Sequence, residues 1–461
     1  MLKLLKYIMH EKFALHSFMK TTLITSFHNF TARNVLVAPF FRMLASEPDI
    51  RIVLVVPQGK AAFYEKTFGG KNIVVHGVSG RLRRIDSFFK DLASASMRTH
   101  SINLMRKYNI GLERPYSQKL LFWAPIFRRF VPFLYARLVG RNTYADIFET
   151  YAPKLLFATD AFHPVDNRLL HEASHRGIAT LSMVRSWDNL TTKGPLRVIP
   201  DVLAVSNTIM KDQAVQEHRM PPDRVIPVGI PFHDRYMHGA KHARDAFIRS
   251  IGADPQKKVI LYAATGDRFF KRNTFDRDFI EMLSAMLPDT HQLLVRYPPA
   301  DVVNLEGLLT KKNVLFERAG VQFSEKSNVF NKNELGPEDD DHLIDTIYYS
   351  DVVVGVTTTL LLDAVLCDRP TIAVGFDLQN RVWKKGSASR VLEYTHMQAF
   401  LKSGGVAVAK TPDELRTTLF EYIKNPARDH EGRMRVRSEQ AYIYDGHASE
   451  RLLAVVRGAI A

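Results

Sequence analysis

The sequence predicts an α/β fold in which two doubly wound parallel sheets face a common cleft. Its 461 residues exceed what one hydrophobic core usually serves. Apolar, β-branched runs without alternation recur between helical segments, and such runs are typical of parallel strands covered on both faces. Strands that alternate with helices in both halves indicate two parallel sheets. The hydrophobic content of 46% and the charged content of 24% are those of an ordinary globular protein.

In the first half, strands and helices alternate along the chain. Strands are expected at Thr21–Ser26, Ile52–Val56, Ile73–Val75, Lys154–Ala158, Thr180–Val184, Val202–Val205 and Val225–Gly229, where apolar and β-branched residues gather. A loop is expected at His28–Asn34 and a helix at Val35–Ala45. The region Ser87–Thr150 is predicted to be mainly helical, and Asn167–Arg176 to form a helix.

The second half repeats this alternation. Strands are expected at Lys258–Ala264, Gln292–Val295, Val314–Glu317, Asp351–Val356 and Gly404–Val408, and helices at His342–Tyr349 and Pro412–Lys424. The acidic run Glu338–Asp341 contains an Asp-x-Asp pattern of the kind that can hold a divalent ion. Because no strand precedes this run, we expect a solvated loop there and no metal site.

The sequence predicts a domain boundary near Tyr236–Ala246, where the basic stretch His238–Arg244 suits a linker. Residues 1–238 would then form the N-terminal domain and residues 245–440 the C-terminal domain. The last segment, 441–461, is expected to be a helix that could return to the first domain.

The stretch Asp351–Gly375 has the pattern of a strand, a tight turn, a short helix and a second strand. Its turn places Thr357, Thr358 and Thr359 where the helix begins. Free amide groups and the positive end of the dipole make a helix start a ready anion site. Threonines can also simply cap a helix, and this alternative stays open. Three in succession, at the carboxyl end of a parallel strand, favour a phosphate site.

Polar side chains also follow the other predicted strands, and ligands of such sheets bind beyond the carboxyl ends of the strands. In the first half these residues are Ser26, His28, Asn29, Thr31, Arg33, Asp160, Arg185, Asp188 and Asn189. In the second half they are Thr265, Gly266, Asp267, Arg268 and Arg296, besides the three threonines. Loops are polar for ordinary reasons too, so the clustering predicts a cleft site more strongly than any single residue does.

The stretch 351–375 resembles the nucleotide-diphosphate end of the second domain of GT-B glycosyltransferases. It is most similar to the branch of CDP-glycerol glycerophosphotransferases and bacterial surface-polysaccharide transferases. That branch carries a hydroxyl-rich turn, an acidic residue in the helix and a (D/N)(R/K)P lead into the next strand. Here these elements are Thr357–Thr359, Asp363 and Asp368-Arg369-Pro370, while Gly355-Val356-Thr357-Thr358 replaces the usual Asp-Tyr-Ser-Ser turn. The resemblance implies a GT-B fold of two Rossmann-like domains, an N-terminal one for the acceptor and a C-terminal one for the nucleotide donor.

The resemblance also implies site residues. The segment 185–194, RSWDNLTTKG, occupies the place of the family's WHGTPLK motif, with Asp188 where the family has histidine. Arg296 matches the basic residue of the family's K-x-H-P segment, where an arginine would pair with phosphate oxygens; a surface ion pair is the alternative. The implied donor-binding residues are Gly266, Asp267, Arg268, Arg296, Thr357, Thr358, Thr359 and Asp363, and the implied acceptor-binding residues are Asn29, Arg185, Trp187, Asn189 and Lys193.

A catalytic base is expected in the cleft, because an acceptor hydroxyl is a poor nucleophile until its proton is taken. The candidates are Asp188 and His28. We prefer Asp188, since a buried Trp187 beside it could raise its pKa toward neutrality. Asp188 could instead cap the following helix through an Asx turn, and His28 could be a loop histidine bonded to the backbone.

The net charge of +15 could indicate nucleic acid, an anionic membrane or polyanionic substrates as partners. No segment resembles a nucleic-acid-binding motif, so we expect no nucleic acid. The basic, aromatic segments Met1–Lys20 and Phe122–Arg141 fit an anionic membrane surface, or alternatively solvated helices with an apolar stripe on the core. A single cysteine, Cys367, excludes an internal disulfide and fits a reducing cytosol. The expected location is therefore cytoplasmic, peripheral on the inner face of the cell membrane.

The expected function is metal-independent transfer of a sugar from a nucleotide-sugar donor to a surface-glycan or lipid-linked acceptor, with no further cofactor. Charge on the leaving diphosphate would be met by Arg296, a helix dipole and hydroxyl groups. Three alternatives stay open: a CDP-alcohol polyol-phosphate transferase of cell-surface polymer synthesis, a sugar-nucleotide epimerase, and a non-catalytic membrane-associated scaffold.

Overall fold

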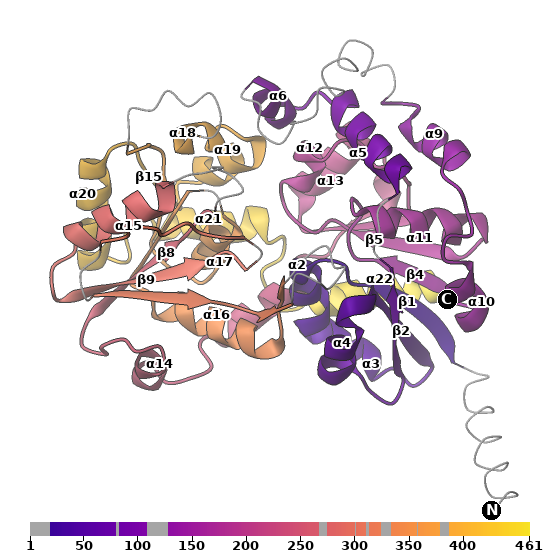
Figure 1. The fold of residues 1–461 in the computed structure, drawn as a ribbon, viewed down its shortest axis with the longest axis horizontal. Coiled ribbons are helices and arrows are strands. Elements are labelled where there is room, and N and C mark those ends of the chain that lie inside the picture. The colour runs from indigo at the N-terminus through magenta and orange to yellow at the C-terminus, as the bar shows by residue number, and fades with distance from the viewer. Residues whose placement is uncertain are drawn as a thin grey trace, which may run out of the picture.

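The computed structural model describes residues 19–79, 83–107, 128–266, 274–299, 301–309, 313–323, 333–356, 358–378 and 387–461. Two parallel sheets, each surrounded by helices, lie next to one another (Figure 1). The predicted fold class, two doubly wound parallel sheets, is confirmed.

The first sheet has seven parallel strands in the order β3-β2-β1-β4-β5-β6-β7. They are β1 (Lys20–Thr25), β2 (Ile50–Pro57), β3 (Ile73–Val78), β4 (Leu155–Ala158), β5 (Ala179–Met183), β6 (Val202–Val205) and β7 (Val225–Pro227). At the centre, Leu23 of β1 lies opposite Val53 of β2 and Leu156 of β4, and all three side chains are fully buried. This burial explains why β4 is a continuous apolar run and β2 nearly one, whereas β1 also buries three threonines.

Helices and helical turns surround the first sheet. They are α2 (Asn29–Thr31), the π-helix η1 (Ala32–Val37), α3 (Pro39–Ala45), η2 (Gln58–Lys60), α4 (Ala61–Phe68), α5 (Arg84–Ser96), α6 (His100–Lys107), α9 (Val131–Leu138), α10 (Ala145–Tyr151), α11 (Pro164–His175), α12 (Asn189–Thr192), α13 (Thr208–His218), η3 (Pro222–Arg224) and η4 (Pro231–His238).

The second sheet has six parallel strands in the order β10-β9-β8-β13-β14-β15. They are β8 (Lys258–Ala263), β9 (His291–Tyr297), β10 (Val314–Arg318), β13 (Val352–Gly355), β14 (Thr371–Val374) and β15 (Ala407–Ala409). The short strands β11 (Val321–Gln322) and β12 (Asn333–Glu334) pair antiparallel outside this sheet. The helices are α14 (Arg244–Ser250), α15 (Phe275–Met286), α16 (Pro337–Tyr349), α17 (Thr359–Leu366), α18 (Ala388–Val391), α19 (Thr395–Lys402), α20 (Pro412–Lys424), α21 (His430–Gln440) and α22 (Ala448–Ile460).

The single helix expected at Val35–Ala45 is wrong in its bounds. The chain forms the helical turn α2 and the π-helix η1 immediately after His28, and α3 begins only at Pro39. Ala38 between them is extended, with φ −61° and ψ 155°. A residue before proline is disfavoured in the helical region, whereas proline itself suits the first helical position. Pro39 therefore both ends the first helical segment and begins the second.

The acidic run Glu338–Asp341, expected as a solvated loop, forms the first turns of α16. Pro337 opens this helix, and the Asp339 carboxylate accepts the backbone N–H groups of Gly336 and Gly320. Acidic residues are stabilising at this end because they meet the positive end of the helix dipole. Asp340 is 1% exposed, so the run is not solvated throughout.

The two halves share one large hydrophobic cluster, which includes Leu36 and Phe232 from the first half and Leu361 and Ile344 from the second. The last helix, α22, packs against α3, β5 and η4 (Figure 1). The C-terminal segment thus lies against the first half of the chain. Among the helices that the structure describes, none combines the length and the apolar character that crossing a membrane requires.

Candidate active site

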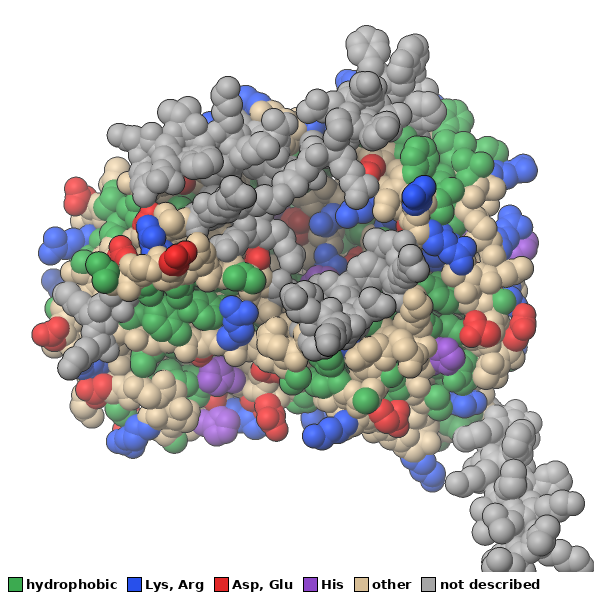
Figure 2. Space-filling view, viewed as in Figure 1, with side chains coloured by type: hydrophobic (Ala, Val, Ile, Leu, Met, Phe, Trp, Pro, Cys, Tyr) green, Lys and Arg blue, Asp and Glu red, His purple; other side chains and the backbone are tan. Residues whose placement is uncertain are grey.

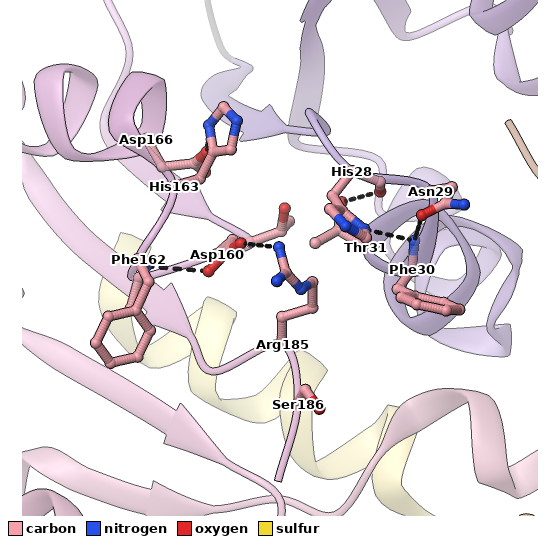
Figure 3. A network of polar contacts seen from close by, with 12 residues as sticks. His28, Asn29, Phe30, Thr31, Asp160, Phe162, His163, Asp166, Arg185 and Ser186 are labelled. Carbon is pink, nitrogen blue, oxygen red and sulfur yellow. Dashed lines mark hydrogen bonds and ion pairs between the residues drawn. The ribbon is translucent and has the colours of Figure 1, made fainter. Parts of the chain in front are cut away.

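Three strand ends of the first sheet bring polar side chains together in the first half of the chain (Figure 3). His28 follows β1, Asp160 follows β4 and Arg185 follows β5. Arg185 forms an ion pair with Asp160, and Asp160 also accepts the backbone N–H of Phe162 at 3.0 Å. The predicted grouping of these side chains at one edge of the sheet is therefore present, although Arg185 already has a charged partner.

His28 caps the helical turn α2 through its Nδ1, which accepts the backbone N–H of Phe30 at 3.2 Å. A backbone amide can only donate, so this contact leaves the ring proton on Nε2. Burial, with the positive charge of Arg185 nearby, holds the pKa of His28 well below 6.5. A neutral ring with its proton on Nε2 is suited to donate a hydrogen bond to a ligand oxygen, and this geometry does not favour His28 as the base.

Asp188 follows β5 and precedes α12, and both of its carboxylate oxygens are engaged. Oδ1 accepts a hydrogen bond from Ser186 at 2.6 Å, and Oδ2 accepts one from Thr192 at 2.9 Å. Burial alone would raise its pKa, but the charges of His396 and Lys193 and the two hydroxyl donors outweigh burial and lower the pKa below 3.8. The expectation that Trp187 raises this pKa toward neutrality is therefore wrong.

The other predicted acceptor-binding residues lie in different surroundings. Trp187 is buried and packs against the rings of His396 and Phe400, with centroid distances of 5.1 and 5.2 Å. Asn189, at the start of α12, is buried, whereas Lys193 at its end is exposed. Asn29 donates to Asn333 of the second half at 3.3 Å and is fully buried. Asn29 therefore joins the two halves rather than facing open solvent.

A pocket between the halves brings together four of the predicted donor-binding residues: Arg296, Thr358, Thr359 and Asp363. Arg296 comes from the end of β9, and the other three come from the start and the middle of α17. Thr358 caps α17 by accepting the backbone N–H of Leu360 at 3.2 Å. Figure 2 shows the hollow between the halves, with charged side chains of both signs visible in it. The capping and phosphate roles of the threonines are compatible, because the cap uses the Thr358 hydroxyl and the Leu360 N–H and does not involve the Thr359 amide.

The remaining predicted donor-binding residues are only partly described. Gly266 has φ +84°, and its N–H donates to Asp276 at 2.9 Å. A Cβ at this position would lie 2.7 Å from the carboxylate of Asp301, so the turn requires glycine. Asp267, Arg268 and Thr357 lie outside the described residues.

The charges of this pocket are already largely paired. Arg296 bonds Glu317 at 2.5 Å, with both side chains nearly buried. Arg33, from η1, bonds Asp363 at 3.3 Å, and Asp363 also lies 3.3 Å from His233. A diphosphate would therefore have to compete with carboxylates for both arginines. The amides and hydroxyls at the start of α17 are the groups that an anion could use without breaking an ion pair.

Asp340 is a pocket residue that sequence reasoning missed. Its Oδ2 has no hydrogen-bond partner among the described residues, and Arg235 is the nearest cation, at 3.9 Å. Burial raises its pKa to about 7, although Arg33 and Arg235 act in the opposite direction. The Gly-Pro step before the acidic run is the signal that could have placed Asp340 in a helical first turn. Among the described residues, no group of three His, Cys, Asp or Glu side chains is arranged to hold a metal ion.

Comparison with solved structures shows the fold alone, because the structures described below are at most 12% identical to this chain. A putative UDP-N-acetylglucosamine 2-epimerase from Listeria monocytogenes is 12% identical to this chain with a TM-score of 0.56, and the match covers 95% of this chain and 96% of that one. A glycosyltransferase from Rickettsia africae is 7% identical with a TM-score of 0.51, over 96% and 99% of the two chains. A variant of the wall teichoic acid polymerase TagF is 11% identical with a TM-score of 0.50, over 96% and 90%.

Sequence comparison assigns the family. No curated protein sequence matches the chain. The family model described as CDP-Glycerol:Poly(glycerophosphate) glycerophosphotransferase matches residues 183–458, which is more than half of the chain. This match includes the segment 185–194, Arg296 and the α17 turn, and it confirms the resemblance drawn from those residues. The chain therefore belongs to the CDP-glycerol:poly(glycerophosphate) glycerophosphotransferase family.

Proposed function

We propose that this transferase moves a sugar from a nucleoside diphosphate carrier to a hydroxyl of a surface-glycan or lipid-linked acceptor, without a metal ion. The observation that carries the proposal is the pocket between the halves, in which the start of α17 and Arg296 lie together. The carboxyl ends of the strands of the second sheet open at this place, where ligands of doubly wound sheets bind.

In this proposal the second half binds the diphosphate and the first half binds the acceptor. The diphosphate would lie against the amides and hydroxyls of Thr358 and Thr359, where the helix dipole stabilises charge on the leaving group. The acceptor would lie against the first half, where His28 offers an Nε2–H donor. The acceptor oxygen would then attack the sugar carbon while the diphosphate leaves with its electron pair.

A second candidate function is transfer of a polyol phosphate from a CDP-alcohol, and the family match favours it. The two reactions release different nucleotides. Sugar transfer releases a nucleoside diphosphate, whereas polyol-phosphate transfer from a CDP-alcohol breaks the diphosphate and releases CMP. Chromatography of the released nucleotide, with EDTA present, separates the two functions and tests metal independence in one assay.

The nucleotide site is tested by thermal shift with UDP, CDP, CMP and GDP. A ligand at a hundredfold excess over its dissociation constant stabilises the fold by about 2.7 kcal/mol. We expect at least one of these nucleotides to raise the melting temperature of the wild type. The double variant Thr358→Val/Thr359→Val should lose that shift, because it removes both hydroxyls from the α17 turn.

A control must separate loss of a helix cap from loss of a ligand, because either change lowers stability. Thr411 caps α20 in the same way, by accepting the backbone N–H of Glu414 at 3.1 Å. Thr411→Val should cost about 1 kcal/mol of stability and keep the nucleotide shift. A wild type that no nucleotide stabilises would contradict the site and would favour a non-catalytic scaffold.

A further inference from the structure

Asp340, in the first turn of α16, lines the pocket in which we place the diphosphate. Thr358 and Thr359 of the α17 turn line the same pocket. The helix α16 packs against η1 of the first half and against α17 of the second half. Asp340 and the proposed diphosphate site therefore belong to one pocket between the halves.

The side chain of Asp340 is buried without a hydrogen-bond partner at one of its oxygens. Among the described residues, nothing bonds its Oδ2. Its neighbour Asp339 shows the contrast, because it accepts the backbone N–H groups of Gly320 at 2.6 Å and of Gly336 at 2.9 Å. An unpaired buried polar atom is costly and calls for an explanation. The fold thus supplies donors to one carboxyl group of this turn and leaves the next one able to bond a ligand.

The positive charges around Asp340 already have other carboxylate partners. Three arginines lie near it, and their partners are Asp363 for Arg33 at 3.3 Å, Glu317 for Arg296 at 2.5 Å, and Asp341 for Arg235. The shortest approach is that of Arg235 Nη1 to Asp340 Oδ2, and its 3.9 Å is too long for a hydrogen bond. Within the part of the chain that the structure describes, Asp340 is thus the carboxyl group of this cluster that each arginine leaves for another partner.

The charge of the pocket depends on whether Asp340 is ionised. The charged residues among the described lining are Arg33, Arg296, Asp339, Asp340 and Asp363. If all of them are ionised, the lining carries a net charge of −1, which would repel a diphosphate. If Asp340 is neutral, that net charge disappears and the carboxyl group gains an O–H donor. Burial raises the pKa of Asp340 to about 7, so the protonated form is present at neutral pH.

We propose that Asp340 binds the nucleoside diphosphate as a neutral carboxylic acid, whose O–H donates a hydrogen bond to a phosphate oxygen. This inference rests on the proposed function, because it assigns a further binding residue of the same donor site. A carboxyl group that its surroundings keep neutral can serve as a donor in this way. The α17 turn and the Asp340 O–H together would then bind the phosphates without breaking the ion pair of either lining arginine.

Nucleotide binding is then coupled to a proton. Above the pKa of Asp340 the free protein has lost this proton and must take one up to bind. The charged groups that face Asp340 are Arg33 of η1, Arg235 of η4, Arg296 of β9 and Asp339 of its own helix. Arginine side chains keep their charge in proteins. His233 of η4 contacts Asp363 and not Asp340.

The test is isothermal titration calorimetry of the full-length protein with UDP, CDP and GDP between pH 7.5 and 8.5. The last ionisation of a terminal phosphate has a pKa of about 6, so these nucleotides are fully ionised in this range. In buffers of different ionisation enthalpy, the wild type should take up about one proton per bound nucleotide at pH 8. Its Kd should rise by up to about tenfold per pH unit, because a shrinking fraction of the protein carries the proton.

Two substitutions separate hydrogen-bond donation from charge. Asp340→Asn is neutral at every pH and keeps an N–H donor, so its Kd should not depend on pH and should be lower than that of the wild type at pH 8.5. Asp340→Ala is neutral but has no donor, and it should bind about tenfold more weakly than Asp340→Asn at every pH. The control is Asp413→Asn, which removes an exposed acidic residue from the first turn of α20 and should keep the pH dependence of the wild type.

Other results overturn the inference. Binding to the wild type without proton uptake refutes it directly, and this measurement needs no variant. An Asp340→Asn protein with the pH dependence of the wild type shows that another group takes up the proton. Equal Kd values for Asp340→Asn and Asp340→Ala, both folded by their melting curves, show that Asp340 repels the ligand without donating to it. If UDP, CDP and GDP all fail to bind the wild type, the proposed donor site is refuted together with the inference.

Discussion

At the scale of single residues, Asp340 in the pocket shows how burial changes the pKa of a carboxyl group. Asp340 and Asp339 are neighbours in the first turn of α16, yet Asp339 accepts two backbone amides while Asp340 has an unpaired oxygen. A buried carboxyl without donors favours its neutral form, because the charged form would lose its hydration. The pKa of Asp340 is accordingly raised to about 7 by burial.

This raised pKa predicts a pH dependence of stability. Between pH 4 and 7 the folded protein keeps a proton on Asp340 that the unfolded chain releases. The free energy of unfolding should therefore fall as pH rises, by up to about 1.4 kcal/mol per pH unit from this group. Urea unfolding of wild type and Asp340→Asn at several pH values checks this, because the variant should lack that part of the slope.

Asp413 supplies the matched control, since it stands in the first turn of α20 but is exposed. Asp413→Asn should keep the wild-type slope. A slope that is the same in Asp340→Asn and in the wild type would contradict the assignment of Asp340 as a protonated carboxyl.

At the scale of elements, α9 is the helix in the described part, residues 128–141, of the predicted membrane-binding segment; residues 122–127 lie outside the described residues. Phe133 and Leu138 on this helix are each 57% exposed, and Phe130 before it is 49% exposed. Arg137 lies over the Phe133 ring, while Arg128 is paired with Glu217 at 2.9 Å. The helix therefore presents apolar side chains beside basic ones, as surface-bound helices do, although Arg128 has a partner within the protein.

We predict that α9 binds anionic membranes. Each arginine near such a surface contributes about 1 kcal/mol, so binding should weaken with added salt. The double variant Phe133→Ser/Leu138→Ser should abolish flotation with vesicles that contain phosphatidylglycerol. Leu309→Ser, which removes a still more exposed leucine from the second half, should bind as the wild type does. Equal flotation with neutral and anionic vesicles would contradict the prediction.

At the scale of the whole molecule, buried ion pairs join the two halves. Lys60, from η2, lies 2.8 Å from Glu334 of β12, and both side chains are 1% exposed. Burial lowers the pKa of Lys60 and raises that of Glu334, while their mutual attraction acts in the opposite direction for each. The desolvation cost of such a pair can equal its Coulomb gain, but an isolated member is strongly destabilising.

Removing one member of this pair should therefore lower the free energy of unfolding more than replacing both members by apolar residues does. Glu334→Gln should lower the free energy of unfolding by roughly 3–5 kcal/mol, because Lys60 would remain buried without a countercharge. The double variant Lys60→Met/Glu334→Leu should recover much of that loss in urea unfolding. Lys258→Met breaks an exposed pair with Asp351 and should cost only about 0–1 kcal/mol. If Glu334→Gln lowers the free energy of unfolding no more than Lys258→Met does, the prediction that a buried ion pair joins the halves is contradicted.

Local patterns in the sequence were enough to predict the two parallel sheets and the polar side chains at their strand ends. A continuous apolar run predicts a buried strand, because both faces of such a strand are covered. The carboxyl ends of parallel strands lie at the same edge of the sheet, so the residues that follow them are close together. His28, Arg185 and Asp188 lie after the predicted strands for this reason, and so does the α17 turn with Thr358. Two prolines also indicated helix starts that the prediction did not use. Pro39 marks the start of α3, and Pro337 marks the start of the helix that contains Asp340.

Only the tertiary structure decided which of these side chains act together. Arg296 forms an ion pair with Glu317, Arg33 forms one with Asp363, and Trp187 packs against His396. The two members of each pair are too far apart in the sequence for a short-range pattern to predict the contact. A pKa depends on burial and on neighbouring charges, and both are set by packing between distant segments. The sequence by itself therefore determined the sheets and the residues at their edges. The packing of one half on the other determined that Asp363 pairs with Arg33 and that Trp187 packs against His396.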